Sequence, residues 1–202
     1  MLKSGNLVDE LFPTKKMGGR KWKTQGSSLF VDPGTAGTGW AFFKRLTLIK
    51  PTPPCETGVI KPRIGDFQAK AMAISVEFRA VVHRLRPQIV VAEFPALWSN
   101  AKSKAAAKRG DLFKLSYLIG ALAVAAGMRP LTLVPPDRWK GQLGKDEVIH
   151  RISRSWIGGS RLRDHEGDAV GMGYAAQNAL NLRQKPGRVR STARQKGRRP
   201  SP

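Results

Sequence analysis

Acidic residues, cysteine and long apolar runs are all scarce in this sequence. Its 202 residues contain 14 Asp and Glu against 36 Lys and Arg, which gives a formal net charge of +22. A positive excess of this size favours a polyanionic partner, and nucleic acid is the partner that we expect. A membrane partner is not expected, because the chain has no run of about 18 apolar residues and no isolated basic amphipathic helix.

The shortage of cysteine limits the chemistry further. Cys55 is the single cysteine, so an internal disulfide and a cysteine-based zinc site are excluded. The N-terminal stretch carries Asp9 and Glu10 and lacks the apolar segment of a signal peptide. We therefore expect a reducing, cytoplasmic location.

Composition divides the chain into a central domain and two basic ends. Hydrophobic residues make up 41%, enough for the core of one α/β domain over 27–183. Residues 1–26 are predicted to be a flexible basic arm, and 184–202 a disordered basic tail. From Arg183 onward there are eight basic residues and no acid. Such a tail either binds phosphates without sequence preference or only aids solubility.

Apolar periodicity within the domain predicts strands first and alternating helices and strands afterwards. Strands are expected over 28–31, 39–45, 88–94 and 130–135. One further strand is expected over 46–50 or, in its place, over 58–61. Helices are expected over 67–85 with Asp66 as the N-cap, from 105 or 111 to 126, over 145–156, and from 164 to about 183. The pattern is typical of an α/β fold with a mixed sheet flanked by helices.

The few acids fall at positions that favour a site. Asp32 follows the apolar run "SSLFV", Glu93 follows "IVVA", and Asp164, His165, Glu166 and Asp168 begin the last helix in "DHEGDA". Each has an ordinary alternative: a turn for Asp32, an ion pair for Glu93, an N-cap for Asp164 and a structural role for His165. Together they are harder to explain this way, because a carboxylate after a buried strand is costly unless it is paired or binds metal.

Three carboxylates with one imidazole suit Mg²⁺ or Mn²⁺ better than a structural zinc ion. His165 and Asp168 lie three residues apart and share a helix face. An acidic site within a basic surface suits phosphodiester cleavage, in which two bound cations activate a water and stabilise the leaving 3′ oxygen.

Four segments, "FVDPGTAGTGWAF", "IVVAEFP", "WKGQLGKDEV" and "DHEGDAVGMGYAA", resemble in order and spacing the RuvC-like Holliday junction resolvases of the RNase H-like superfamily. The resemblance spans residues 29–182. It implies an RNase H-like five-stranded mixed sheet, a homodimer, and Mg²⁺-dependent paired nicking of four-way DNA junctions that leaves 5′-phosphate and 3′-OH ends. The long basic ends look more like those of viral or phage members, so the cellular origin stays open, and we expect the cytoplasm of a bacterial cell or of a phage-infected host.

The resemblance also implies roles for single residues. Its catalytic metal ligands fall on Asp32, Glu93, His165 and Asp168, which would hold two Mg²⁺ ions, with Mn²⁺ able to substitute. Asp164 is a neighbour that caps the helix or supports the ligands. Trp98 either stacks on the junction or packs in the core. The DNA contacts that we expect come from Trp98, Lys102, Lys104, Lys108, Arg109, Lys140 and Lys145.

Three other functions remain open from the sequence. A RuvC-like nuclease could cut flaps, forks or three-way junctions as well. The "DPGTAGTGWA" segment faintly resembles the phosphate-binding hairpin of sugar-kinase and actin-like ATPases, although 202 residues leave no room for their second domain. A noncatalytic basic DNA-binding protein would explain the charge but not the arrangement of Asp32, Glu93, His165 and Asp168.

Overall fold

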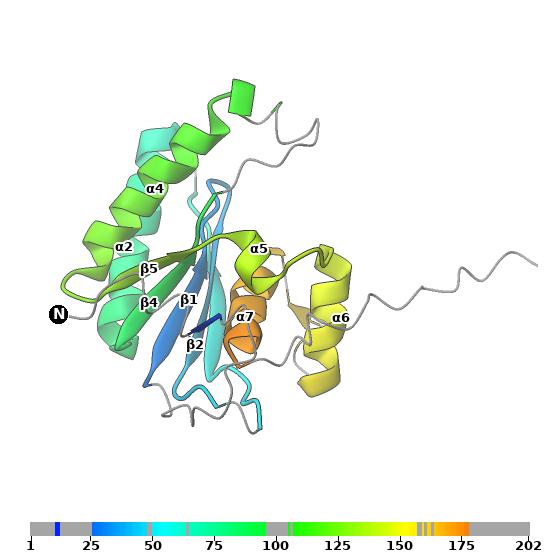
Figure 1. The fold of residues 1–202 in the computed structure, drawn as a ribbon. Helices are drawn as coiled ribbons and strands as arrows, with labels where there is room; N and C mark the ends of the chain where they lie inside the picture. The colour runs from blue at the N-terminus through cyan, green and yellow to red at the C-terminus, as the bar shows by residue number, and fades with distance from the viewer. Residues whose placement is uncertain are drawn as a thin grey trace, which may run out of the picture.

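The fold is built around a five-stranded mixed sheet (Figure 1). The computed structural model describes residues 11–12, 26–47, 50–63, 65–95, 105, 107–156, 159, 161–162 and 164–177. The strands are β1 (Ser28–Asp32), β2 (Thr38–Phe43), β3 (Glu56–Ile60), β4 (Ile89–Glu93) and β5 (Leu131–Val134), in the order β3-β2-β1-β4-β5. β2 is antiparallel to β1 and β3, whereas β4 is parallel to β1 and β5. The prediction of a mixed five-stranded sheet is confirmed.

Helices cover both faces of the sheet (Figure 1). On one face lie α2 (Phe67–Leu85) and α4 (Asp111–Ala126). On the other lie α5 (Pro136–Trp139), α6 (Lys145–Ser155) and α7 (Asp164–Ala176). α2 begins where expected, because the Asp66 carboxylate accepts a hydrogen bond of 2.8 Å from the backbone N–H of Ala69. None of the helices described is long and apolar enough to cross a membrane.

Successive side chains of β1 point to opposite faces of the sheet, and each face has its own apolar core. Leu29 and Val31 pack toward α2 and α4, while Phe30 packs toward α7. Successive side chains of a strand point to opposite faces, so Asp32 lies on the same face as Phe30. β1 is buried along its whole length, and its three central residues, Leu29 to Val31, are all apolar.

Several details differ from the sequence-based prediction. The third strand is β3, so the alternative at 58–61 is close to correct. The other expectation, a strand over 46–50, is not met in the described part of that range, residues 46–47 and 50. The short helix α5 was not predicted, although Pro136 stands at its first turn, a common position for proline. Leu118 and Leu122 on α4 are fully buried, whereas Phe113 and Val124 on the same helix are exposed.

Two residues of the predicted N-terminal arm belong to the core on the α7 face. Leu11 and Phe12 are 1% and 4% exposed and pack in the same cluster as Phe30 and Tyr174. The apolar core therefore includes a segment that precedes the predicted domain boundary at residue 27. The predicted tail over 184–202 lies outside the described residues.

Candidate active site

The pairing of β1 and β4 places two carboxylates side by side. The parallel register joins Val31 to Ala92, so Asp32 and Glu93 are the next residues along the two strands. Phe30 and Val91, two residues earlier on each strand, both pack on the α7 face. Alternation therefore directs Asp32 and Glu93 to that face, at the carboxyl edge of the parallel strands, where α/β sheets commonly carry their functional groups.

α7 brings two more predicted site residues to the same place. A Cβ atom at Gly39 of β2 would lie only 2.1 Å from the carbonyl carbon of His165, so only glycine lets α7 approach the strand this closely. Gly34 likewise leaves room for the imidazole, because a Cβ there would lie 2.5 Å from Cε1 of His165. The small residues after Asp32 thus allow the start of α7 to rest on the sheet.

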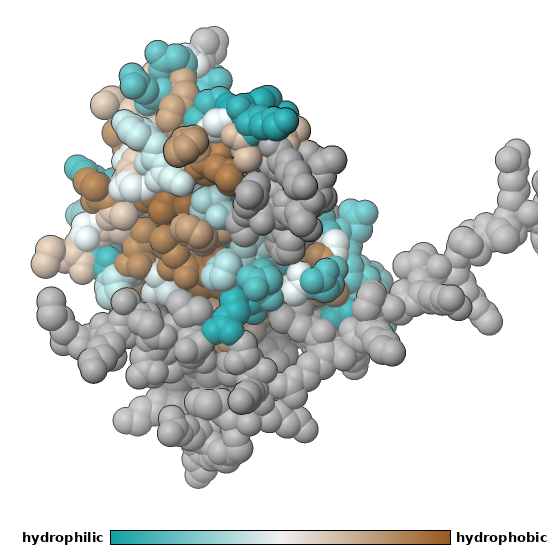
Figure 2. Space-filling model, turned by 45° about the horizontal axis from the view of Figure 1, so that its top comes forward, coloured by the Kyte–Doolittle hydropathy of each residue, from teal (hydrophilic) through white to brown (hydrophobic). Residues whose placement is uncertain are grey.

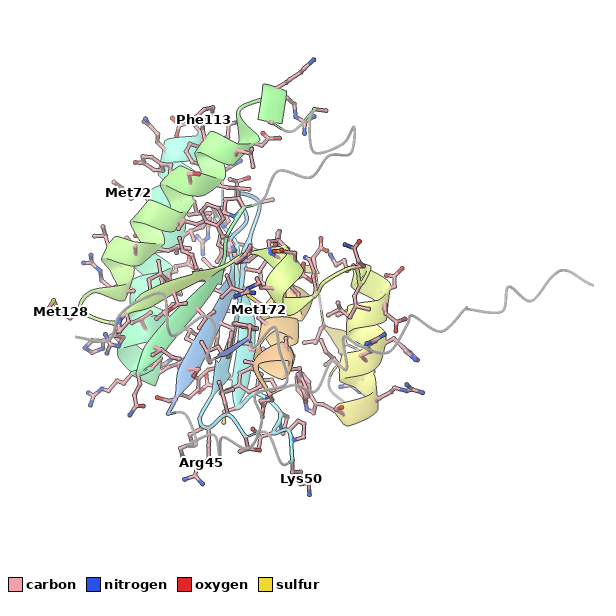
Figure 3. The ribbon with its side chains drawn as sticks, viewed as in Figure 1. Arg45, Lys50, Met72, Phe113, Met128 and Met172 are labelled. Carbon is pink, nitrogen blue, oxygen red and sulfur yellow. The ribbon has the colours of Figure 1, made fainter. Side chains whose placement is uncertain are left out.

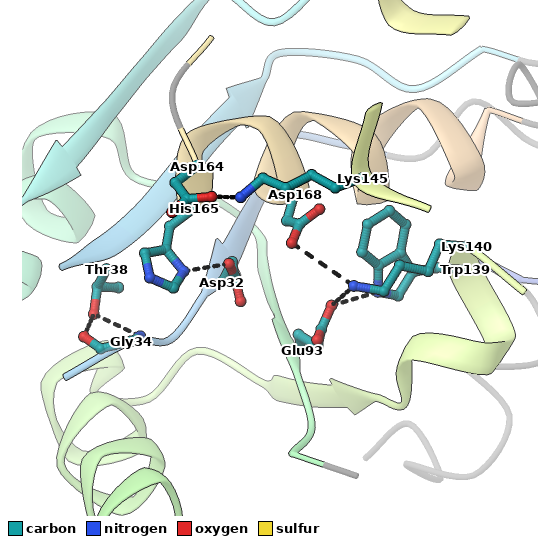
Figure 4. A network of polar contacts seen from close by, with 10 residues as sticks. All are labelled: Asp32, Gly34, Thr38, Glu93, Trp139, Lys140, Lys145, Asp164, His165 and Asp168. Atoms are coloured by element: carbon teal, nitrogen blue, oxygen red, sulfur yellow. Dashed lines mark hydrogen bonds and ion pairs between the residues drawn. The ribbon is translucent and has the colours of Figure 1, made fainter. Parts of the chain in front are cut away.

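Two groups of polar contacts make up the site (Figure 4). On one side, Nδ1 of His165 lies 2.6 Å from Oδ2 of Asp32. On the other, Nζ of Lys140 lies 3.5 Å from Oε2 of Glu93 and 3.7 Å from Oδ2 of Asp168. The four residues predicted as ligands therefore converge on one edge of the sheet, with a lysine between two of them.

Burial and crowding of negative charge perturb the titration of this group. The pKa of Glu93 is raised from an ordinary 4.5 to about 7, first by burial and then by the charge of Asp32. Burial also raises the pKa of Asp168. The pKa of His165 is raised, chiefly by its hydrogen bond to Asp32. Negative charge is costly here and positive charge is favoured, which is typical of a site that requires a cation.

The donor set fits a divalent cation by its chemistry, but the side chains are not gathered around one point. Within the described residues, no group of three or more His, Cys, Asp or Glu is arranged to hold a metal ion. The ammonium group of Lys140 lies between Glu93 and Asp168 instead. Three partly or wholly buried carboxylates and one imidazole are nevertheless ligands that Mg²⁺ and Mn²⁺ accept.

The predicted DNA contacts are only partly placed. Lys108 and Arg109 are exposed just before α4, and Nη2 of Arg109 lies 2.9 Å from Oδ2 of Asp111. Lys145 begins α6 and forms an ion pair with Asp164, which joins the first turns of α6 and α7. Lys140 is half-buried among the acids. Trp98, Lys102 and Lys104 lie outside the described residues.

Trp139 is a member of the site that the sequence analysis did not single out. Its indole Nε1 donates a hydrogen bond of 2.8 Å to Oε2 of Glu93. Its ring is completely buried. The available signal was the "PPDRWK" segment, in which a proline that starts a short helix precedes an aromatic and a basic residue.

Comparison by sequence gives no match, either to a protein-family model or to a curated protein. Comparison by structure gives clear matches. The Thermus thermophilus RuvC in complex with a Holliday junction substrate has a TM-score of 0.56 at 19% identity, over 79% of this chain and 96% of that one. Another Thermus thermophilus RuvC structure gives 0.54 at 19% identity, over 78% and 95%.

The yeast mitochondrial Holliday junction resolvase Ydc2 has a TM-score of 0.54 at 15% identity, over 90% of this chain and 96% of that one. The protein therefore has an RNase H-like fold. Its arrangement of strands and helices matches that of RuvC and Ydc2, which is the fold that the sequence resemblance implied.

Proposed function

We propose that the protein is a metal-dependent endodeoxyribonuclease that resolves four-way DNA junctions. The observation that carries the proposal is the convergence of Asp32, Glu93, His165 and Asp168 at the carboxyl edge of a RuvC-type sheet. The net charge of +22 supports a polyanionic substrate, and a RuvC has been solved with a Holliday junction. A broader specificity for flaps, forks or three-way junctions is the second candidate.

The four residues would hold two divalent cations, Mg²⁺ or Mn²⁺. When bound, the cations supply activation of a water and stabilisation of the leaving 3′ oxygen. Asp32 and Glu93 would provide ligands from the ends of β1 and β4, and His165 and Asp168 would provide them from the start of α7. Water adds to phosphorus, the bond to the 3′ oxygen breaks, and that oxygen takes up a proton, which leaves 5′-phosphate and 3′-OH ends.

The basic residues near the site have a separate task. Lys145 at the first turn of α6, and Lys108 and Arg109 before α4, would bind phosphates of the DNA arms. Their charge offsets the repulsion between the acids and the DNA backbone, so binding should weaken steeply with salt.

A homodimer would present two active sites to the two equivalent strands of a junction. An exposed apolar face on α2, α4 and the turn after α4 supports this assembly: Met72, Val76, Phe113, Tyr117, Val124 and Met128 are each more than half exposed. Figure 2 shows apolar residues gathered over this side of the molecule, and Figure 3 shows Met72, Phe113 and Met128 pointing outward from it. Contiguous apolar surface of this kind is typical of protein contacts.

Cleavage of defined DNA tests the enzymatic proposal. Labelled four-way, flap and linear duplexes are incubated with Mg²⁺ or with EDTA, and ATP hydrolysis is measured alongside. We expect Mg²⁺-dependent nicking of the four-way junction, and no nicking by Asp32→Asn or Asp168→Asn. These variants should still bind the junction, because an amide keeps the shape and removes only the charge. Loss of binding together with cleavage would favour a structural role for the acids.

Light scattering at micromolar concentration tests the dimer. We expect a dimer for the native chain and a monomer of about half that mass for the double variant Phe113→Ser, Val124→Ser. Lys44→Ser, at an exposed residue directly after β2, serves as the control. A native monomer, both free and bound to a junction, would contradict paired nicking.

A further inference from the structure

Trp139 is placed to control the orientation of Glu93. The tryptophan ends the short helix α5, and its ring is fully buried against α7, where a Cβ at Gly171 would lie 2.8 Å from Cζ3. Its Nε1 donates a hydrogen bond to Oε2 of Glu93, and the two atoms lie 2.8 Å apart. A buried indole has little freedom to move, so the hydrogen bond fixes one oxygen of a side chain that otherwise has several rotamers.

Lys140, the next residue, contacts the same carboxylate. Its Nζ lies 3.5 Å from Oε2 of Glu93, 3.7 Å from Oδ2 of Asp168 and 4.8 Å from the centroid of the Trp139 ring. The ammonium group therefore lies between two acids that come from different elements, β4 and α7. A single positive charge in this position reduces the repulsion between them.

The two sides of the site are held differently. Asp32 is joined to His165, which is itself a predicted ligand. Glu93 is held by Trp139 and Lys140, neither of which is a ligand that a hard divalent cation would take. A neutral indole can keep its bond to Oε2 when a cation binds, whereas the ammonium of Lys140 would be repelled by that cation.

We propose that Trp139 is a positioning residue that fixes Glu93 for metal binding, and that Lys140 is a tethered counter-ion which a divalent cation displaces from Glu93 and Asp168. The inference rests on the proposed function, because it requires the acids to bind a divalent cation. It assigns the segment Trp139–Lys140 a part in preparing the site before any DNA arrives.

Manganese binding to the free protein, measured by electron paramagnetic resonance, tests both roles without a cleavage assay. Trp139→Phe keeps the ring and removes the N–H donor; we expect Mn²⁺ affinity to fall about tenfold or more, as for other residues that orient metal ligands. The control is Trp156→Phe, a tryptophan that packs partly buried against the same core. We expect it to leave Mn²⁺ affinity unchanged.

Lys140→Met keeps the apolar stem and removes the charge. We expect its Mn²⁺ affinity to rise about tenfold, because the cation no longer competes with an ammonium group. Unchanged or weaker Mn²⁺ binding by Lys140→Met, measured at pH 8.5, would overturn the counter-ion role.

The indole N–H resonance of Trp139 in the ¹⁵N-labelled native protein gives a readout that does not require Trp139→Phe or Lys140→Met to fold. We expect this resonance to shift when Mg²⁺ is added, to remain unshifted by Mg²⁺ in Glu93→Gln, and to shift more than that of Trp156. Native protein that binds no Mn²⁺ would overturn the proposed function and this inference together. Native binding that Trp139→Phe leaves unchanged, or a Trp139 resonance insensitive to Mg²⁺, would overturn the positioning role alone.

Discussion

Replacing Glu93 with glutamine should stabilise the metal-free protein at pH 8 while removing its activity. The Glu93 side chain is only 16% exposed, and burial together with the charge of Asp32 raises its pKa from 4.5 to about 7. Glutamine resembles the protonated acid and can still accept the indole N–H of Trp139. The variant therefore avoids the cost of ionising Glu93 inside the fold.

The size of the effect follows from the two pKa values. Between about pH 4.5 and 7 the folded chain binds more protons at Glu93 than the unfolded chain does, so stability falls as pH rises through this range. Each pKa unit corresponds to about 1.4 kcal/mol, which makes the loss above pH 7 roughly 3 kcal/mol. For a chain of this size that corresponds to roughly 6–12 °C in melting temperature.

Urea unfolding in EDTA at pH 5 and pH 8 measures the effect. At each pH, the free energy of unfolding of the native chain is subtracted from that of Glu93→Gln. The value at pH 5 is then subtracted from the value at pH 8. Because the other groups titrate in both proteins, the result reports on Glu93. We expect about 2.5 kcal/mol in favour of the variant, because roughly 0.8 kcal/mol of the loss has already occurred at pH 5. Glu77→Gln, an exposed carboxylate on α2, should give a value near zero. A Glu93→Gln variant that gains nothing between pH 5 and pH 8 would refute the reasoning.

Three further predictions concern the packing at Gly39, the titration of Glu93 and the basic C-terminal tail. Gly39→Ala should lower the free energy of unfolding by several kcal/mol and displace α7, since its Cβ would collide with the backbone of His165. Gly120→Ala has open space around it and should raise the free energy of unfolding by about 0.5–1 kcal/mol. Urea unfolding of both variants measures the two changes. Mg²⁺ affinity, measured by calorimetry, should rise as pH increases through about 7, because Glu93 must lose its proton; a flat profile from pH 5.5 to 8 would contradict this. Deleting residues 185–202 should weaken binding to all DNA forms alike and lower the salt slope by about 0.9 for each phosphate that the tail neutralises; a change in junction selectivity alone would show another role for the tail.

Most of the fold could be predicted because its elements carry strong local signals. α2 shows helical spacing of apolar residues between an Asp66 cap and Pro87, and β1 and β4 are short apolar runs that end in an acid. The third strand was ambiguous because β3 is largely half-buried and has a weak apolar pattern. Buried and exposed faces of α4 could not be told apart, since its sequence is apolar nearly all round.

The acidic residues of the candidate site were predictable because acids are scarce in this sequence. Asp32 and Glu93 stand out because few acids occur and both follow apolar strands. The contacts of Trp139 and Lys140 with Glu93 were not predictable, because they depend on how α5 packs against β4 and α7 rather than on spacing along the chain. The close approach at Gly39 is likewise a tertiary feature that a run of small residues only suggests.

Nick mapping on a four-way junction tests the central claim most directly. A junction with fixed arms is labelled on each strand in turn, cut in Mg²⁺, and its products are treated with DNA ligase. We predict nicks at symmetric positions on two strands of like polarity, with ends that ligase reseals, and no nicks by Asp168→Asn. Cutting confined to flaps or linear duplex, or nicking that persists in Asp168→Asn or in EDTA, would contradict the assignment of this site as a metal-dependent junction resolvase.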